Sequence, residues 1–495
     1  MLRRVRTGVS RPFVALGAAM LALVTSCSTA QRSPDAPNRQ ADVAPTAPMS
    51  GEGVGDPTYP VLGDVVDFGE GKPPQVYDGY LTAALTDIES FWANGFEAVY
   101  GEPWTPLDGG VYAAWPARDE PIPGCGNEVS TYDEVATSGA FYCRAGDFIA
   151  YDDHELLPGM VKGLGAQAVA IVLAHEFGHA VQARTGDFDE PVILKEQQAD
   201  CFAGAWAAHV AHSADSSISF DDSDIRTALI AMIQIRDPVE AGGLANPEAH
   251  GTGFDRVGAF QDGFIGGIAR CATFFTENRM DQLIDVPFLS PFDDPNGGDL
   301  PLIDPAAAGD DIVTLIPASL DLYWVPLLTR SGFEFTPPTL IGFSLNEVPP
   351  GCTGLRRTDI ARAAVWCPAT NVIHLDMHES ERLLSDRLSG DLSVAYLIAS
   401  AYSEAVQTTV GTGLSGALRS LRNDCFSGAW VGANVPPTGA DSIVELSAGD
   451  LDEAVVTLIS HSDPTDDTDV EGAAFEKVEA FRTGVLGGLD ACLGS

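Results

Sequence analysis

Two histidines at helical spacing offer the clearest chemistry in this sequence. The run HEFGH spans His175–His179 and lies in an apolar stretch, residues 164–184, that predicts a buried helix. Residues four apart on a helix share one face, so both imidazoles can reach a single zinc ion. Glu176 would lie beside that ion, where it can take a proton from bound water. The spacing therefore predicts a metal site with an adjacent general base.

Two carboxylates on the next predicted helix can complete this site. Glu196 follows His179 by 17 residues, and Asp200 comes one helical turn later on the same face. We expect Glu196 to be the third zinc ligand. We expect Asp200 to accept a hydrogen bond from the far nitrogen of His175, which would fix the tautomer of that ring. The alternative is a solvated acidic face on a surface helix, but the apolar run at 201–206 favours burial.

Four separated motifs, in order along the chain, resemble the bacterial putative neutral zinc metallopeptidase family. These motifs are residues 124–126 with 141–143, 175–182, 196–206 and 250–256. The resemblance covers roughly residues 75–280. It implies a gluzincin-like peptidase acting on proteins or peptides, with one Zn²⁺ on His175, His179 and Glu196 and with Glu176 as the general base.

The implied reaction is hydrolysis of a peptide bond, which needs a further donor for the tetrahedral oxyanion. His250 is the candidate donor, with Arg256 nearby in the sequence; alternatively, His250 caps or packs against the following helix. A cleft beside the strand predicted at 148–153 is expected to hold the substrate backbone by strand addition. This chain departs from the family at two positions, neither of them a proposed ligand. The family usually has Ser where this chain has Gly253, and often a second His where this chain has Ala180.

The sequence contains a second, altered copy of the same pattern. The segment ADCFAGAW at 199–206 recurs as NDCFSGAW at 423–430, and residues 260–271 have counterparts in 481–492. The offsets between matched positions fall from 232 to 221, which is typical of a duplicated unit whose loops have been trimmed. We therefore expect an α+β fold, zincin-like and mainly helical with a small sheet, in two tandem homologous domains.

The second copy lacks the proposed zinc ligands. Ser400, Glu404 and Ser420 stand where the first copy has its two His and its Glu, and a register shifted by one residue also has no His. Asp424 matches Asp200 but is expected to have nothing to orient. We expect one Zn²⁺, in the first domain only. The second domain would widen the substrate groove, dock a partner or stabilise the first domain, and the sequence does not choose among these roles.

The nine cysteines indicate an exported protein with disulfide bonds. Cys27 is the odd one, and the other eight are divided equally between the two copies. No CxxC pair occurs, which argues against a zinc site made of cysteines. Among the pairings that the sequence leaves open, the economical one joins Cys125 to Cys143, Cys201 to Cys271, Cys352 to Cys367 and Cys425 to Cys492.

The N-terminus predicts a lipoprotein leader. Four Arg within the first eleven residues precede an apolar run at 12–24, which suits a signal peptide better than a membrane-spanning helix. The tetrapeptide at 24–27 resembles a bacterial lipobox, which implies cleavage before Cys27, lipidation of Cys27 and anchoring on the outer face of the cell membrane. The alternative is an ordinary secretory peptide with an incidental Cys. Residues 28–58 are rich in Pro, Ala, Ser and Asp and predict a flexible tether.

Composition limits the possible partners. The 495 residues carry 70 acidic and 27 basic side chains, a formal charge of −43, so nucleic-acid phosphates would be repelled. The predicted order is signal peptide 1–26, tether 27–58, zinc metallopeptidase domain 59–290, linker 291–311 and degenerate peptidase-like domain 312–495. The rival interpretation is a non-catalytic envelope lipoprotein, an interaction or assembly module with a vestigial metal site. A third is a latent protease whose residues 59–90 lie over the cleft.

Overall fold

The described chain is mainly helical, with small sheets. The computed structural model describes residues 3–4, 65–126, 129–235, 246, 249–274, 279–284, 286, 299–303, 309–343, 352, 364–436, 442–461 and 474–494. Apart from residues 3–4, the predicted leader, Cys27 and the tether lie outside the described residues, as does most of the predicted linker 291–311. The α+β class predicted from the sequence is therefore confirmed for the part of the chain that is described.

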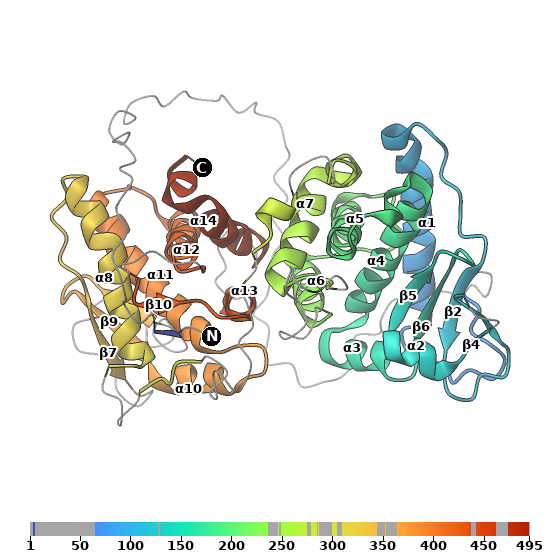
Figure 1. The fold of residues 1–495 in the computed structure, drawn as a ribbon, viewed down its shortest axis with the longest axis horizontal. Helices are drawn as coiled ribbons and strands as arrows, with labels where there is room; N and C mark the ends of the chain where they lie inside the picture. The colour runs from blue at the N-terminus through green and yellow to red at the C-terminus, as the bar shows by residue number, and fades with distance from the viewer. Residues whose placement is uncertain are drawn as a thin grey trace, which may run out of the picture.

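Figure 1 shows two halves of the chain side by side. The elements of the N-terminal half are α1 (Asp78–Tyr100), β2 (Gly110–Ala114), β3 (Ile122–Pro123), β4 (Val129–Ser130), α2 (Tyr132–Ser138), β5 (Ala140–Cys143), β6 (Phe148–Asp152), α3 (Leu156–Leu164), α4 (Ala166–Thr185), α5 (Val192–His212), α6 (Asp222–Gln234) and α7 (Gly253–Ala272). Those of the C-terminal half are α8 (Ile312–Arg330), β7 (Thr339–Phe343), β8 (Ala364–Cys367), β9 (Val372–Asp376), α10 (Met377–Ser385), α11 (Asp391–Val410), α12 (Gly416–Gly432), β10 (Val444–Glu445), α13 (Asp450–His461) and α14 (Ala474–Gly494). A two-residue strand, β1 (Arg3–Arg4), pairs with β10.

Each half contains a three-stranded sheet of the same topology. In the N-terminal half the strand order is β2-β6-β5, with β2 parallel and β5 antiparallel to β6. In the C-terminal half it is β7-β9-β8, with the same pairing directions. The strand predicted at 148–153 is β6, and both of its edges are already paired. The expectation that substrate adds to this strand is therefore wrong, because a middle strand has no unpaired edge to offer.

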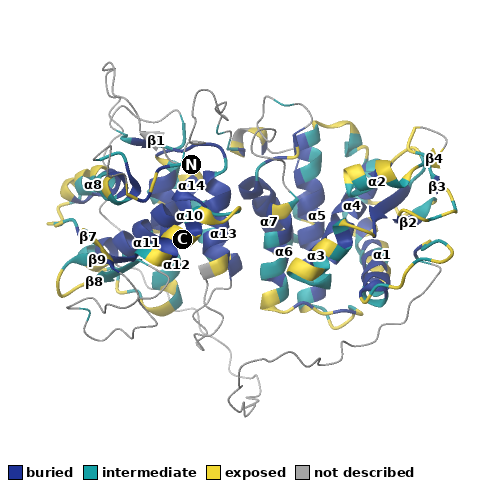
Figure 2. Ribbon diagram, turned by 90° about the horizontal axis from the view of Figure 1, so that it is seen from below, coloured by how far each residue is buried: buried dark blue, intermediate teal, exposed yellow. Residues whose placement is uncertain are grey.

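The two helices predicted around the metal motifs are confirmed as α4 and α5, and the helix expected after His250 is α7. Helix α4 is apolar on nearly every side and is buried from Ala168 to Gly178, because other helices cover it (Figure 2). Helix α1 is also part of the core, and its Leu81, Leu85 and Ile88 are buried. The latent-protease alternative would require a separate segment lying over the site. Residues 78–90 instead pack into the fold.

Glycines allow the central helices to approach closely. A Cβ atom added at Gly178 of α4 would lie 2.7 Å from the Cα of Ala199 in α5. One added at Gly204 of α5 would lie 2.0 Å from the carbonyl oxygen of Phe260 in α7. Real Cβ contacts are not this short, so a larger residue would force the helices apart. These two crossings bring α4, α5 and α7 together around the predicted site.

The same close contacts recur between α12 and α14. A Cβ added at Gly428 would lie 2.1 Å from the carbonyl oxygen of Phe481. This contact matches the one between Gly204 and the Phe260 carbonyl oxygen in the first half. Helices α7 and α14 both kink near their C-terminal ends at a glycine with positive φ, at Gly267 (64°) and Gly488 (65°).

Four disulfides join Cys125 to Cys143, Cys201 to Cys271, Cys352 to Cys367 and Cys425 to Cys492, the pairs expected from the cysteine order.

The two halves pack directly against each other. Helices α6 and α7 of the first half contact α13 and α14 of the second, and Figures 1 and 2 show these helices facing one another at the centre of the molecule. Among the described residues, one helix, α8, is long and apolar enough to cross a membrane. Its Leu315, Ile316, Leu320 and Trp324 are buried.

Candidate metal site

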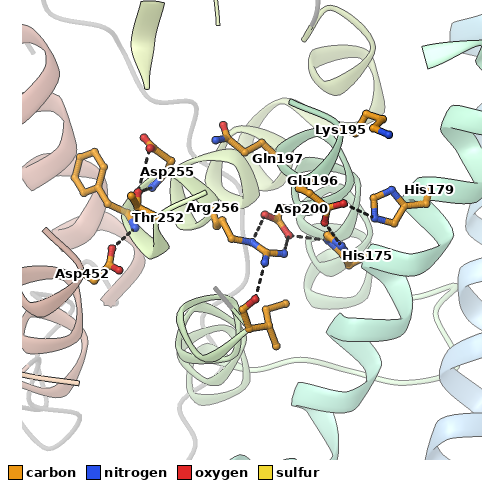
Figure 3. A network of polar contacts seen from close by, with 12 residues as sticks. His175, His179, Lys195, Glu196, Gln197, Asp200, Thr252, Asp255, Arg256 and Asp452 are labelled. Atoms are coloured by element: carbon orange, nitrogen blue, oxygen red, sulfur yellow. Dashed lines mark hydrogen bonds and ion pairs between the residues drawn. The ribbon is translucent and has the colours of Figure 1, made fainter. Parts of the chain in front are cut away.

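Three side chains from α4 and α5 converge on one point. The Nε2 atom of His175 lies 3.2 Å from one carboxylate oxygen of Glu196, and the Nε2 atom of His179 lies 3.4 Å from the other (Figure 3). One donor atom from each residue fits within 4.8 Å of the other two, so the group could hold a metal ion. The structure thus brings together the three residues that the sequence suggested as ligands.

Helix geometry explains the convergence. His175 and His179 are one turn apart on α4, and their rings meet edge to face with centroids 4.8 Å apart. Gly178 lies between them in sequence and allows α5 to cross α4 at Ala199. The crossing brings Glu196, three residues before Ala199, opposite the two imidazoles. A bulkier residue at the crossing would separate the carboxylate from both rings.

Asp200 holds the outer side of His175. Its Oδ1 accepts a hydrogen bond from His175 Nδ1 at 2.7 Å, as the sequence predicted. Its two oxygens also accept hydrogen bonds from Nε and Nη2 of Arg256, each at 2.8 Å. A third guanidinium nitrogen of Arg256 donates to the carbonyl oxygen of Ile235 at 2.8 Å. Arg256, expected only as a neighbour of His250, is therefore the cation that neutralises the fully buried Asp200.

Gln182 plays the corresponding part for His179. Its side-chain oxygen accepts a hydrogen bond from His179 Nδ1 at 2.9 Å, while its nitrogen donates to the Lys195 carbonyl oxygen at 2.7 Å and to Gln198 at 3.0 Å. Sequence reasoning missed this role, although Gln182 recurs at the matching position of the second copy. Because Nδ1 of each histidine donates outward, Nε2 is the nitrogen of each ring that faces Glu196.

The charges around the site suit a cation. Burial alone would lower the pKa of His175, but attraction to Asp200 and Glu196 outweighs it and raises that pKa to about 10. The pKa of His179 is raised as well, because Glu196 outweighs burial there. The same attractions overcome the effect of burial on Glu196 and hold its pKa well below the ordinary value. Two imidazole nitrogens and one carboxylate are also the donors that catalytic zinc sites use.

Glu176 is adjacent to this group but is not a member of it. It is buried on α4, between the two histidines in sequence. Its carboxylate is close enough to His179 to favour the charged form of that ring, which raises the histidine pKa further. A buried acid next to three convergent donors, and separate from them, is the arrangement that a general base requires.

His250 does not join the convergent donors. It is exposed, in the loop that precedes α7. The next residue, Gly251, packs against Ile193 and the side chain of Gln197 in α5. The loop therefore runs beside the part of α5 that carries Glu196. The role of His250 as a donor to the oxyanion stays a prediction.

The corresponding place in the C-terminal half has a different network. Glu404 forms an ion pair with Arg419 and accepts a hydrogen bond from Asn423 at 2.9 Å. Asp424, which was expected to have nothing to orient, accepts a hydrogen bond from the Tyr396 hydroxyl at 2.6 Å. That expectation is wrong, because a buried tyrosine takes the place of the histidine ring as donor. Gln407 keeps the position of its counterpart and donates to the Arg419 carbonyl oxygen at 2.8 Å.

Two other groups within the described residues have donors close together. Cys352, Cys367 and His374 form one, but the two cysteines are joined in a disulfide and cannot ligate as thiolates. Asp299, Asp391 and Glu453 form the other. Burial raises the pKa of Glu453 to about 8. Oxygen donors alone suit hard cations better than zinc, so this group does not resemble the histidine site.

Comparisons with known proteins agree with the site. Residues 81–274 match the sequence profile of the family described as putative neutral zinc metallopeptidase. The match covers 81–274 of the 495 residues, so the similarity to that family is one of this segment. The matched range includes the two histidines, both carboxylates on α5 and all of α7.

The chain also resembles proteins of unassigned function. It is 29% identical over 222 residues to "Uncharacterized protein YpfJ" of Escherichia coli K12, covering 39% of this chain and 70% of that protein. It is 32% identical over 177 residues to "Uncharacterized protein Rv2575" of Mycobacterium tuberculosis H37Rv, covering 30% of this chain and 58% of that protein. No solved structure matches the chain significantly.

Proposed function

We propose that the chain is a zinc-dependent peptidase whose active site lies between α4 and α5. The observation that carries the proposal is the convergence of His175, His179 and Glu196, with the buried Glu176 beside them. Structural zinc sites normally close with four protein ligands, whereas the described part of the chain supplies three here, which leaves a position for water and substrate. The family match over residues 81–274 supports the same chemistry.

The residues of the site divide the work of peptide hydrolysis. A zinc ion bound by His175, His179 and Glu196 would polarise the scissile carbonyl. It would also lower the pKa of a water molecule, so that this water can give up a proton and attack the carbonyl carbon. Glu176 accepts the proton of the attacking water and delivers it to the leaving amine. Asp200 and Gln182 keep both imidazole rings turned with Nε2 inward. We propose His250 as the further donor to the oxyanion.

The proposal also covers the organisation of the chain. Two tandem homologous domains, of which only the first has zinc ligands, would explain the matching sheet topology and the matching glycine contacts of the two halves. Ser400, Glu404 and Ser420 replace the three ligands in the second domain. We further propose that residues 1–26 direct export and that Cys27 anchors the protein through lipid to the outer face of the membrane; this rests on the sequence alone.

The decisive variant is Glu176→Gln, which keeps the size of the side chain and removes its basicity. We expect zinc content to stay at one per chain and cleavage of casein or of cell-envelope proteins to fall by at least about 100-fold, the usual contribution of a general base. Glu190→Gln, which changes an exposed carboxylate in the same region, is the matched control and should leave both unchanged. Unchanged cleavage by Glu176→Gln would refute the mechanism and favour the rival, a non-catalytic envelope module.

A further inference from the structure

Residues from both halves of the chain build the first turn of α7. Thr252 caps the helix by accepting a hydrogen bond from Asp255 N at 3.1 Å, but the first-turn N–H of Phe254 needs a partner outside the helix. That partner is Asp452, in the first turn of α13, whose Oδ1 lies 2.7 Å from Phe254 N (Figure 3). Both Phe254 and Asp452 are buried, so water does not compete for this hydrogen bond.

A second residue of the C-terminal half holds the same turn. Arg482 in α14 donates a hydrogen bond to the Phe254 carbonyl oxygen, and its guanidinium lies over the Phe254 ring, 4.5 Å from the centroid. Gly258, one turn further along α7, makes room for it, because a Cβ there would lie 1.8 Å from an Arg482 nitrogen. The C-terminal half therefore contacts the backbone N–H, the carbonyl and the ring of Phe254.

Hydrogen bonds connect the first turn of α7 to the metal site. Arg256 follows Phe254 by two residues in α7 and holds both oxygens of Asp200, which in turn holds His175. Arg256 is only 2% exposed and Asp200 is fully buried, so their contact depends on the position of the α7 backbone. Hydrogen bonds weaken steeply when their angle or length departs from the optimum. A displaced first turn would therefore loosen Asp200 and the ring that it orients.

We propose that Asp452 and Arg482 are positioning residues of the metal site, and that the C-terminal half supports zinc binding by holding the first turn of α7. The connection runs through buried contacts from Asp452 to Phe254, Arg256, Asp200 and His175. This gives the zinc-free half a function in the active site of the other half. The inference rests on the proposed zinc site, but it concerns the affinity and geometry of that site and not turnover.

Zinc affinity of the full chain, measured by competition with a chromophoric chelator, tests the proposal. Asp452→Ala should weaken zinc binding about 3- to 10-fold, less than the roughly 10- to 100-fold usual for a direct hydrogen-bond partner of a ligand. Asp452→Asn keeps the acceptor for Phe254 N and should restore affinity to within about twofold of the unaltered chain. At saturating Co²⁺, the visible spectrum of Asp452→Ala should differ from that of the unaltered chain, because it reports ligand geometry.

Gln261→Met is the matched control at the same interface. Gln261 lies two turns further along α7 and donates a hydrogen bond to the Phe475 carbonyl oxygen of α14 at 2.8 Å. Among the described residues, its hydrogen bond joins α7 to α14 and involves neither Arg256 nor Asp200. Loss of this bond should therefore lower the melting temperature and leave zinc affinity and the Co²⁺ spectrum unchanged. An equal loss of affinity in Gln261→Met and Asp452→Ala would overturn the proposal, as would unchanged affinity in Asp452→Ala.

Arg482→Met provides an independent variant if Asp452→Ala fails to fold. It removes the donor to the Phe254 carbonyl oxygen and should also weaken zinc binding with an altered Co²⁺ spectrum; unchanged values would overturn the proposal. Neither readout requires turnover. A chain that binds zinc with the predicted dependence on Asp452 but cleaves no peptide would refute the proposed function and still support this inference.

Discussion

Asp200 carries two separable roles, and Asp200→Asn should reveal both. Its carboxylate orients His175 at 2.7 Å and neutralises Arg256 through two hydrogen bonds of 2.8 Å. Removing a carboxylate that orients a metal-ligating histidine typically weakens metal binding 10- to 100-fold, or about 1.4–2.7 kcal/mol. Leaving a buried guanidinium without its anion costs about 3–5 kcal/mol of folding stability. We therefore expect losses in both zinc affinity and thermal stability.

Zinc affinity is measured by chelator competition and stability by calorimetry of the metal-free chain. Adding Arg256→Met to Asp200→Asn removes the uncompensated charge, so about 2 kcal/mol or more of stability should return. Zinc affinity should stay low in the double variant, because His175 still lacks its charged acceptor. The two measurements thus separate the electrostatic support of the fold from the orientation of the ligand.

Asp424→Asn is the matched control in the C-terminal half. Asp424 is buried like Asp200 but accepts its hydrogen bond from Tyr396, and asparagine can accept the same bond. We expect zinc affinity to be unchanged in this variant. If folded Asp200→Asn binds zinc within about twofold of the unaltered chain, the assignment of His175 as an oriented ligand is refuted.

Two further sets of variants test the crossing of α4 and α5 and the buried Asp255. Gly178→Ala places a Cβ 2.7 Å from the Ala199 Cα, so calorimetry should show a loss of about 1–3 kcal/mol together with weaker zinc binding. Gly159→Ala, inside α3, meets no atom within 4 Å; it should leave zinc affinity unchanged and stabilise the chain by up to about 1 kcal/mol. Equal behaviour of the two variants would contradict the close crossing of α4 and α5. Burial raises the pKa of Asp255 from 3.8 to about 6, so the native state keeps this proton after the unfolded chain has lost it. The contribution of Asp255 to stability should therefore fall by up to about 1.4 kcal/mol per pH unit from pH 4 to 6. Asp255→Asn, which cannot titrate, should accordingly gain stability relative to the unaltered chain as the pH rises over this range. If the difference in melting temperature between Asp255→Asn and the unaltered chain does not change with pH, the raised pKa of Asp255 is contradicted.

Local spacing predicted the convergent donors because helical periodicity fixes which residues share a face. His175 and His179 follow from a single helix, and Glu196 and Asp200 from the next, so only the crossing of two neighbouring helices had to be assumed. The order of the cysteines in two similar segments left several disulfide pairings open, and the economical one among them is the pairing that the structure has. These features depend on short separations or on repetition, and both are visible in a sequence.

The missed features depend on tertiary contacts between distant segments. Arg256 reaches Asp200 across 56 residues, and no periodicity connects them; only the need of a buried carboxylate for a cation could have indicated such a partner. Tyr396 as the donor to Asp424 was missed for the same reason. Strand order also cannot be derived from a local pattern, so β6 was wrongly expected to have a free edge.

The central claim is that His175, His179 and Glu196 together hold one zinc ion. Anomalous diffraction at the zinc absorption edge, on crystals of the purified chain, tests it most directly. We predict one peak at about 2.0–2.1 Å from Nε2 of both histidines and about 2.0–2.2 Å from a Glu196 oxygen. A zinc-loaded crystal with no peak between α4 and α5, or with its zinc bound by other residues, would contradict the account.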